Sequence, residues 1–287
     1  MVSTAHEQTP VALVTGASAG IGLVTARALA QRGARVVTVS RAGGAGAAQA
    51  QAIARETGAE VSFLPADLSR PREAFEVAQR VRDAYGRVDV LINNAGAFFD
   101  RRSLSADGVE MTFALNHLGP FALTAALLPE LRASAGRVIT VSSNAALGGA
   151  LQLDDPNSER RFSGWRAYAW SKLCNQLFAL ELARREGGAG VSSASMHPGF
   201  VATSFGHEGR FAGAVKLLQR LFARTPERGA DTVVWLATER DLPGVNGAYY
   251  VDRRVRPVAA LARDEGAQAE LWALSERALE AAGVTLP

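Results

Sequence analysis

Short apolar runs alternate along this chain with longer segments in which apolar residues recur every three or four positions. Short runs rich in β-branched residues predict strands, and long periodic segments predict amphipathic helices. The predicted strands are residues 11–15, 35–40, 61–64, 88–92, 137–142, 191–196 and 247–251. The predicted helices are the segment that ends at residue 31, and residues 45–57, 71–85, 111–132, 165–185, 225–238 and 264–282. Pro120 lies inside the fourth of these helices and is expected to bend it.

Strands and helices alternate in this order along nearly the whole chain. Strands that are apolar on both faces belong to a parallel sheet covered by helices, and a repeated strand–helix order predicts a doubly wound α/β fold. We therefore expect one sheet of about seven strands with helices on both faces. Neither a repeat of solenoid period nor a long linker is visible, so a single domain over residues 1–287 is expected, with a helical extension at 264–282.

Composition narrows the class of protein. The 287 residues are 48% hydrophobic, and 31 basic against 28 acidic residues give a formal charge of +3. The basic residues form no long run, so the sequence predicts no nucleic-acid partner. One cysteine, Cys174, and four dispersed histidines predict no disulfide and no metal site. Without an anchor or leader pattern, we expect a cytoplasmic, soluble protein with no membrane anchor.

A glycine-rich loop follows the first predicted strand and opens a helix, with the sequence TGASAGIG from Thr15 to Gly22. Gly16 permits a tight turn, Gly20 lets the backbone approach a phosphate, and Gly22 allows close packing of helix on strand. The helix N-terminus would face a dinucleotide pyrophosphate, with Ser18 adding a hydroxyl. The alternative is an ordinary glycine-rich turn without a ligand.

Ser40 and Arg41 stand at the end of the second predicted strand. A site for NAD(H) places a carboxylate there to bind the ribose 2′-hydroxyl. The guanidinium of Arg41 instead matches a 2′-phosphate, and no acid is present to repel that group. The sequence therefore predicts NADP(H), unless Arg41 is only a solvated surface residue.

Two further strand ends carry residues suited to a nucleotide. Asp67, followed by Leu68, comes after the third strand, where its carboxylate is placed to accept from an adenine amino group. A cap of the helix that begins near Pro71 is the alternative role for Asp67. The sequence Asn93-Asn94-Ala95-Gly96 follows the fourth strand, and its small residues and amides suit passage of a ribose or a structural turn.

Tyr168 and Lys172 are four residues apart on a predicted helix and share a face. A tyrosine titrates near pH 10, and a nearby ammonium is expected to lower that pKa so that the phenol can exchange a proton with a carbonyl or alcohol. Ser143, at the end of the fifth strand, is expected to hold the substrate oxygen, with Ser142 in a structural role. Asn116 is expected to fix the bent helix and a water that leads to Lys172, or only to satisfy backbone groups. Alone, the tyrosine–lysine spacing is equally typical of a surface pair.

Taken together, these motifs resemble the short-chain dehydrogenase/reductase superfamily from Val11 to Val251. The motifs, in order, are TGASAGIG, Asp67–Leu68, NNAG, Asn116, Ser143, YAWSK and His197-Pro198-Gly199. The resemblance implies a Rossmann-type fold, a tetrad of Asn116, Ser143, Tyr168 and Lys172, and reversible hydride transfer between a nicotinamide and a carbonyl or alcohol carbon. It implies that the cofactor is held by Gly16, Ser18, Ala19, Gly20, Ile21, Gly22, Ser40, Arg41, Asp67, Leu68, Asn94, Ala95, Gly96, Tyr168, Lys172, Pro198, Gly199, Val201 and Thr203.

Several longer stretches are similar to the retinol-dehydrogenase-like branch of that superfamily. They are FALNHLGPFALT, SKLCNQLFALELARR, HPGFVATSF and the terminal GAYYVDRRV with LWALSE. The 25 residues from Ser143 to Tyr168 also resemble that branch, which commonly uses NADP(H). Three positions depart from the pattern: Ala19 and Leu23 stand where basic residues are frequent, and Ser18 stands where the branch often has Asn. These departures leave Arg41 as the main expected contact with a 2′-phosphate.

The segment 200–225 is expected to cover the active site as an apolar lid that excludes water. Its apolar residues are Phe205, Phe211, Val215, Leu217, Leu218, Leu221 and Phe222. Phe98, Phe99 and Trp165 are expected to line the same cleft, which favours a hydrophobic substrate. The alternative is that the lid residues pack on the domain or on a second subunit. Cys174 is expected to face the core, and His197 to sit in a packed turn.

Three functions are consistent with these features. The first is an NADP(H)-dependent oxidoreductase acting on a hydrophobic or secondary-metabolite ketone, aldehyde or alcohol. The second is a cofactor-binding regulatory protein without catalysis, against which the complete tetrad argues. The third keeps the fold and bound cofactor but performs epimerisation or dehydration. The superfamily often forms dimers or tetramers through its long helices, so a homodimer or homotetramer through 111–132 and 165–185 is a further expectation.

Overall fold

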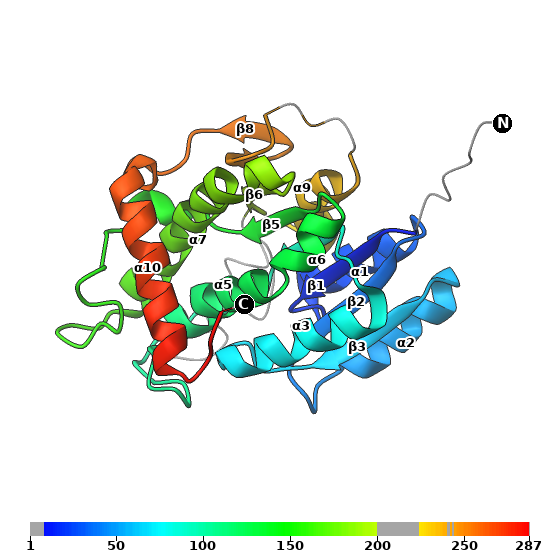
Figure 1. The fold of residues 1–287 in the computed structure, drawn as a ribbon, viewed down its shortest axis with the longest axis horizontal. Coiled ribbons are helices and arrows are strands. Elements are labelled where there is room, and N and C mark those ends of the chain that lie inside the picture. Colours follow the sequence, from blue (N-terminus) through cyan, green and yellow to red (C-terminus); the bar gives the residue numbers. More distant parts are fainter. Residues whose placement is uncertain (1–8, 200–223, 240–241, 243, 287) are drawn as a thin grey trace.

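The structure is a computed structural model that describes residues 9–199, 224–239, 242 and 244–286. Within them, strands form one sheet in the order β3-β2-β1-β4-β5-β6-β7-β8 (Figure 1). The strands are β1 (Val11–Thr15), β2 (Arg35–Ser40), β3 (Val61–Pro65), β4 (Val90–Asn93), β5 (Arg137–Val141), β6 (Ser192–His197), β7 (Ala248–Val251) and β8 (Arg254–Arg256). Neighbours from β3 through β7 pair in parallel, so the predicted doubly wound parallel fold is confirmed.

Helices cover both faces of the sheet. They are α1 (Gly20–Ala30), α2 (Gly46–Thr57), α3 (Pro71–Tyr85), α4 (Met111–Phe113), α5 (Gly119–Ala126), α6 (Leu128–Ala133), α7 (Gly164–Glu186), α9 (Pro226–Thr238) and α10 (Glu265–Ala281). Residues of α1, α2 and α9 share one buried apolar cluster with the sheet, and residues of α3, α5 and α7 share another. The carboxyl-terminal α10 lies outside α5 and α7, on the side away from the sheet (Figure 1). Cys174 of α7 is fully buried, as expected.

The order of strands reverses at β1. The chain runs from β1 outward through β2 and β3, and then returns to place β4 on the other side of β1. Val14 is level with Ile92 of β4, and Thr15 is level with Val39 of β2. In open α/β sheets, ligands bind at the carboxyl ends of strands where the order reverses. The glycine loop after β1 and the Asn94 loop after β4 therefore lie at the point where a ligand-binding crevice is expected.

The sheet has eight strands in the described residues rather than about seven. β8 pairs antiparallel with β7, and its three residues are exposed, so it has no apolar pattern to indicate it. The turn before it places Asp252 at φ 52° and Arg253 at φ 57°, a left-handed conformation unusual for residues other than glycine. Arg253 forms an ion pair with Asp231 of α9 and its N–H donates to Thr232 Oγ1 at 3.2 Å. These contacts hold the strained turn against α9.

The predicted helix 111–132 is wrong as a single element. The segment comprises α4, a π-helix over Ala114–Leu118, α5 and α6. In the π-helix the N–H of Gly119 donates to the carbonyl of Ala114, five residues earlier. Pro120 has no N–H to donate to the carbonyl of Asn116, so an α-helical bond is missing there in any case. The expected disturbance thus begins before the proline, in a wide turn that carries Asn116.

Among the helices of the described residues, none combines the length and the apolar character that a membrane span requires.

Candidate active site

The glycine loop follows β1 and leaves no room for side chains at two positions. Gly16 lies at φ +66°, and its N–H donates to the Val39 carbonyl at 2.8 Å. A Cβ on Gly22 would lie 2.4 Å from the Gly16 carbonyl oxygen and 2.5 Å from Nδ2 of Asn94. Glycine at position 22 therefore allows the first turn of α1 to pack closely on the glycine loop and on Asn94. We expected this glycine to allow packing mainly on a strand. Gly20 also takes a positive φ, 57°.

The first turn of α1 presents its N–H groups without a capping side chain. Ala19 is the N-cap residue, no side chain caps the helix, and no acid lies in its first turn. Ala19 is exposed, Ser18 is half-buried and Ile21 packs in the core. Free N–H groups and the positive end of the helix dipole form an anion site when no side chain satisfies them.

Ser40 and Arg41 end β2 beside this loop. Arg41 is exposed, and among the described residues it has no ion pair or hydrogen bond. Ser40 Oγ is buried without a partner in that part of the chain, and a Cβ on Gly46, the first residue of α2, would lie 2.5 Å from it. The arrangement leaves the guanidinium of Arg41 unneutralised at the edge of the crevice.

Asp67 and Leu68 form part of the turn between β3 and α3. Oδ1 of Asp67 accepts from the N–H of Ser69 at 3.0 Å and from its hydroxyl at 2.8 Å. Arg70 is the N-cap residue of α3 and no side chain caps that helix, so Asp67 is not its cap. Leu68 is buried in the core beside Gly119 of α5, which leaves its side chain out of reach of a ligand in the crevice.

Thr15, which the sequence analysis did not single out, fixes the loop after β4. Its hydroxyl donates to the Ile92 carbonyl at 3.2 Å and accepts from the N–H groups of Asn94 and Ala95 at 2.9 and 3.0 Å. Nδ2 of Asn94 donates back to the Thr15 carbonyl at 2.8 Å. The signal available in the sequence was a hydroxyl residue that ends a buried strand directly before the glycine turn.

Asn116 lies in the π-helix and is fully buried. Its Oδ1 accepts from the N–H of Ala97 at 2.8 Å, and its Nδ2 donates to the Ala97 carbonyl at 2.9 Å and to Ser171 Oγ at 3.0 Å. A Cβ on Gly96 would lie 3.1 Å from Oδ1 of Asn116 and 3.4 Å from Nζ of Lys172. The Asn116 side chain thus holds the loop after β4 by the N–H and the carbonyl of Ala97. The side chains of Asn116 and Lys172 both lie beside Gly96.

Tyr168 and Lys172 project from α7 toward the end of β5. The Tyr168 hydroxyl hydrogen-bonds with the Ser143 side chain. Nζ of Lys172 lies 5.7 Å from the centre of the Tyr168 ring and donates to the Val141 carbonyl at 3.0 Å. Ser142 Oγ donates to the backbone carbonyl of Lys172 at 2.7 Å, which ties α7 to β5. The structure therefore brings together Ser143, Tyr168 and Lys172, with Asn116 on their flank.

Burial is the main cause of the pKa shifts of Tyr168 and Lys172. It raises the pKa of Tyr168 to about 12, while the hydrogen bond from Ser143 acts in the opposite direction. Burial lowers the pKa of Lys172 to about 8. The expected lowering of the Tyr168 pKa by Lys172 is wrong for this arrangement, because the ammonium binds the Val141 carbonyl and the phenol is shielded from water. The phenol is protonated at neutral pH.

Aromatic side chains flank Tyr168. Phe98 meets its ring edge to face with centres 5.9 Å apart, and Trp165 lies 6.3 Å away on the preceding turn of α7. The Trp165 side chain is 60% exposed, a large apolar surface open to solvent. Gly164 allows this approach, because a Cβ there would lie 2.4 Å from the Phe99 carbonyl oxygen.

The chain after β6 passes the same end of the sheet. His197, Pro198 and Gly199 are half-buried, and Gly199 lies at φ +82°. The side chain of Arg224 covers Gly199, since a Cβ there would lie 2.7 Å from Nε of Arg224. Burial, followed by the charge of Arg224, lowers the pKa of His197 to about 4. The histidine is neutral at pH 7. It is the last residue of β6, level with Val251 of β7, rather than part of the packed turn we expected.

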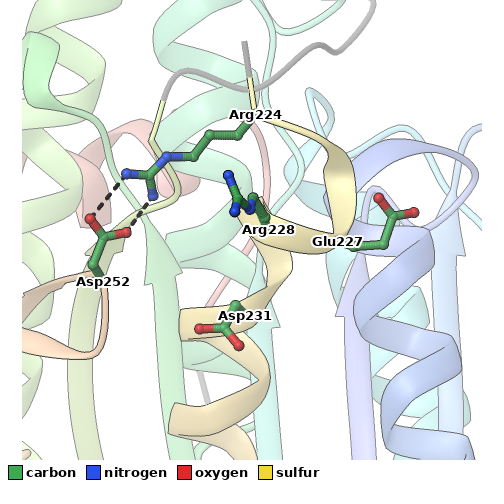
Figure 2. Close-up of a pocket in the computed structure, with 5 residues that line it drawn as sticks. All are labelled: Arg224, Glu227, Arg228, Asp231 and Asp252. Atoms are coloured by element: carbon green, nitrogen blue, oxygen red, sulfur yellow. Dashed lines mark hydrogen bonds and ion pairs between the residues drawn. The ribbon is translucent and has the colours of Figure 1, made fainter. Parts of the chain in front are cut away.

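Arg224 was not predicted, and it belongs to a charged cluster at the start of α9. Its guanidinium forms an ion pair with Asp252, with Nη2 3.0 Å from Oδ2 (Figure 2). The cluster borders a cavity of about 530 Å³, and its residues are Arg224, Glu227, Arg228, Asp231 and Asp252. Val201, Thr203 and residues 200–223 of the lid expected at 200–225 lie outside the described part of the chain.

Comparisons with known proteins identify relatives of this chain. Residues 10–210 match the family described as short chain dehydrogenase. "Putative daunorubicin C-13 ketoreductase DnrU" of Streptomyces sp. (strain C5) is 40% identical over 268 residues, 93% of this chain and 91% of that protein. Human retinol dehydrogenase 11 is 38% identical over 278 residues, 96% of this chain and 87% of that protein. A short-chain dehydrogenase from Sphingobium yanoikuyae, solved with NADPH, is 27% identical with a TM-score of 0.65, covering 81% of this chain and 86% of that one.

The chain therefore belongs to the short-chain dehydrogenase family, in its retinol-dehydrogenase-like branch. Its chemistry is nicotinamide-dependent oxidoreduction of a small molecule.

Proposed function

We propose that this protein transfers hydride between NADP(H) and an apolar ketone or aldehyde, or the corresponding alcohol. One observation carries the proposal: a protonated phenol, Tyr168, hydrogen-bonds to Ser143 between two aromatic side chains at the carboxyl end of the sheet. A proton donor, an oxygen-binding hydroxyl and an apolar surface in one place suit reduction of a hydrophobic carbonyl.

In the reductive direction each side chain has a distinct role. The Ser143 hydroxyl holds the carbonyl oxygen, and Tyr168 donates its proton to that oxygen as negative charge develops there. Lys172, with its pKa near 8, is largely charged at pH 7 and stabilises the phenolate that remains. Asn116 fixes the loop that borders the site through Ala97. In the oxidative direction the deprotonated form of Tyr168 would accept the proton of the alcohol.

The residues present fit a nicotinamide dinucleotide. The uncapped first turn of α1 provides N–H groups for the pyrophosphate. The missing side chain at Gly96 leaves space beside Asn116 and Lys172, where Nζ is within reach of a ribose. When bound, the nicotinamide supplies or accepts the hydride.

Preference for NADP(H) rests on Arg41. Its guanidinium is exposed and has no carboxylate partner in the described residues, so a 2′-phosphate would gain a charge-assisted bond there. The solved relative that holds NADPH supports the same cofactor. Absence of an acid at positions 40 and 41 removes the contact that an NAD site makes with the 2′-hydroxyl.

The proposal of an apolar substrate rests on Phe98 and the exposed Trp165. Burial of this aromatic surface is most favourable when a hydrophobic molecule, preferably a planar one, covers it. The relative named as a daunorubicin ketoreductase and the retinol dehydrogenases support ketones, aldehydes and alcohols attached to large apolar skeletons.

The test is a fluorescence titration with NADPH and NADH, followed by a panel of carbonyl compounds and alcohols graded by apolar area. We expect tighter binding of NADPH and a rise in kcat/KM with apolar area. Equal binding of the two cofactors would contradict the role of Arg41. NADPH binding without hydride transfer to any carbonyl of the panel would favour a non-catalytic regulatory protein instead.

A further inference from the structure

His117 follows Asn116 in the π-helix and points to the opposite side, toward the carboxyl-terminal helix. Its Nε2 lies 2.9 Å from the hydroxyl oxygen of Ser275 on α10, and both residues are buried. The two residues are 158 positions apart in the chain. A single hydrogen bond therefore joins α10 to the wide turn that carries a candidate active-site residue.

The hydrogen-bond partners of Ser275 fix the direction of this bond. The Ser275 hydroxyl donates its only hydrogen to the Leu271 carbonyl at 2.8 Å. With its hydrogen used in that bond, the hydroxyl accepts from His117, and this assignment places the imidazole hydrogen on Nε2. Nδ1 is buried without a partner among the described residues, and burial lowers the pKa of His117 to about 3. The imidazole is neutral, and the bond to Ser275 is its one polar contact in that part of the chain.

The surroundings of the bond are aromatic and buried. The His117 ring lies 5.1 Å from that of Phe113 and 6.2 Å from those of Phe121 and Phe178. Trp272 of α10, one turn before Ser275, packs edge to face on Phe121 with centres 4.9 Å apart. In a packed apolar environment an imidazole N–H that loses its partner cannot find water in exchange.

On the other side of the same turn, Asn116 holds Ala97 with two hydrogen bonds and Ser171 with a third. A π-turn is rare because it is less favourable than the α-helix it interrupts, and such turns recur at functional sites. It persists here between two attachments, one to the loop after β4 and one to α10. Removal of either lets the turn relax toward regular helix, which would rotate Asn116 away from Ala97.

We propose that Ser275 and His117 are positioning residues, through which α10 holds the π-helix in the register that directs Asn116 into the active site. The proposal rests on the proposed function for its kinetic consequence, but its structural part is independent of the substrate. The carboxyl-terminal helix then has a role in catalysis that it exerts through the π-helix.

The test compares Ser275→Ala, which removes the acceptor, with Ser275→Thr, which keeps a hydroxyl. Leu279→Ala is the matched control, since Leu279 is fully buried one turn further along the same helix and a leucine side chain has no hydrogen bond to the π-helix to lose. We expect Ser275→Ala to lower kcat about tenfold, with KM and the Kd for NADPH within about twofold of wild type. Ser275→Thr should recover most of kcat. Leu279→Ala should lower the Tm without lowering kcat where it is folded.

Two further measurements make the result decisive. In an Asn116→Ala background, Ser275→Ala should have no additional effect on kcat, because both changes act through one residue. Hydrogen exchange of the amides of residues 114–119 should accelerate in Ser275→Ala and remain unchanged in Leu279→Ala.

Unchanged exchange and kcat in Ser275→Ala would overturn the proposal, and so would equal losses of kcat in the two alanine variants. Additive losses in the Asn116→Ala background would overturn it as well. Absence of turnover in the wild type would contradict the proposed function alone, because exchange still reports whether α10 holds the turn.

Discussion

Lys172 donates its hydrogen bond to the Val141 carbonyl, 3.0 Å away, and not to the hydroxyl of Tyr168. Its ammonium lies 5.7 Å from the centre of the Tyr168 ring, with a pKa near 8, while the pKa of the phenol is near 12. At pH 7 both groups therefore carry their protons. This is the combination that carbonyl reduction needs at its start: a phenol that can donate, and a cation that stabilises the phenolate.

The first prediction concerns the pH dependence of reduction. Since Lys172 loses its charge above about pH 8, kcat/KM for NADPH-dependent reduction should fall as pH rises through that value. Lys172→Arg keeps a cation at every accessible pH, so whatever activity it retains should not fall between pH 8 and 10. Initial rates between pH 6 and 10 check this. A wild-type profile that is flat over that range would count against a role for the lysine charge.

Arg41 provides the second prediction. Arg41→Glu replaces the proposed phosphate contact by a charge that repels it, so KM for NADPH should rise about 10- to 100-fold while KM for NADH changes little. Arg55→Glu is the control, because Arg55 is also exposed and lies on the neighbouring helix α2. Steady-state kinetics with both cofactors measure the change. Equal increases in the KM for NADPH in the two variants would show that general surface charge, and not a phosphate contact, causes the change.

The third prediction separates stability from cofactor binding at α1. Ala19→Asp gives the helix the capping side chain it lacks and should stabilise the fold by about 1 kcal/mol. The same carboxylate would occupy the N–H groups proposed for the pyrophosphate, so binding of both NADPH and NADH should weaken about tenfold or more. Thermal unfolding and cofactor titration provide the two readouts. Retained affinity in the stabilised variant would place the pyrophosphate elsewhere.

The fourth prediction concerns stability in acid. The unfolded chain binds a proton at His117 near pH 6.5, but the folded protein binds it only near pH 3, because burial excludes the charge. Between these values the unfolded state holds more protons, so the free energy of unfolding should decrease as pH falls below 6.5, by about 1.4 kcal/mol per pH unit for this one group.

Substitution His117→Phe should remove that contribution. Urea denaturation at pH 7, 6, 5 and 4 should give a shallower dependence than in wild type, whatever the starting stability of the variant. Part of the dependence will remain, because burial also lowers the pKa of His197, to about 4. Parallel curves for the two proteins would show that His117 is not held neutral by the fold.

The fold followed closely from periodicity, because seven of its strands are short apolar runs and most helices are long and amphipathic. β8 was missed since its residues, Arg254–Arg256, are all exposed and pair only at the sheet edge. The π-helix was missed because its residues have the apolar spacing of an ordinary helix. It is distinguished by the backbone bond from the Gly119 N–H to the Ala114 carbonyl, and the contacts of Asn116 and His117 with distant segments accompany that bond. Tertiary contacts of this kind leave no local pattern.

Candidate site residues could be predicted where chemistry and position coincide, as for Tyr168 and Lys172 on one helix face. The direction of the pKa shift could not, because it depends on burial by segments far along the chain. Arg224 was beyond prediction for the same reason: it reaches Gly199 and Asp252 only in the folded protein. Thr15 could have been found as the hydroxyl residue directly before the glycine turn.

The most direct measurement is single-turnover hydride transfer from NADPH in wild type and Tyr168→Phe, with a carbonyl substrate that the wild type reduces. Tyr85→Phe, which removes a phenol that contacts Ser62 of β3 at the end of α3, is the control. We expect a loss of about 10²- to 10⁴-fold in Tyr168→Phe, with the Kd for NADPH unchanged, and wild-type rates in the control. Hydride transfer at the wild-type rate in Tyr168→Phe would contradict the proposed chemistry of this site.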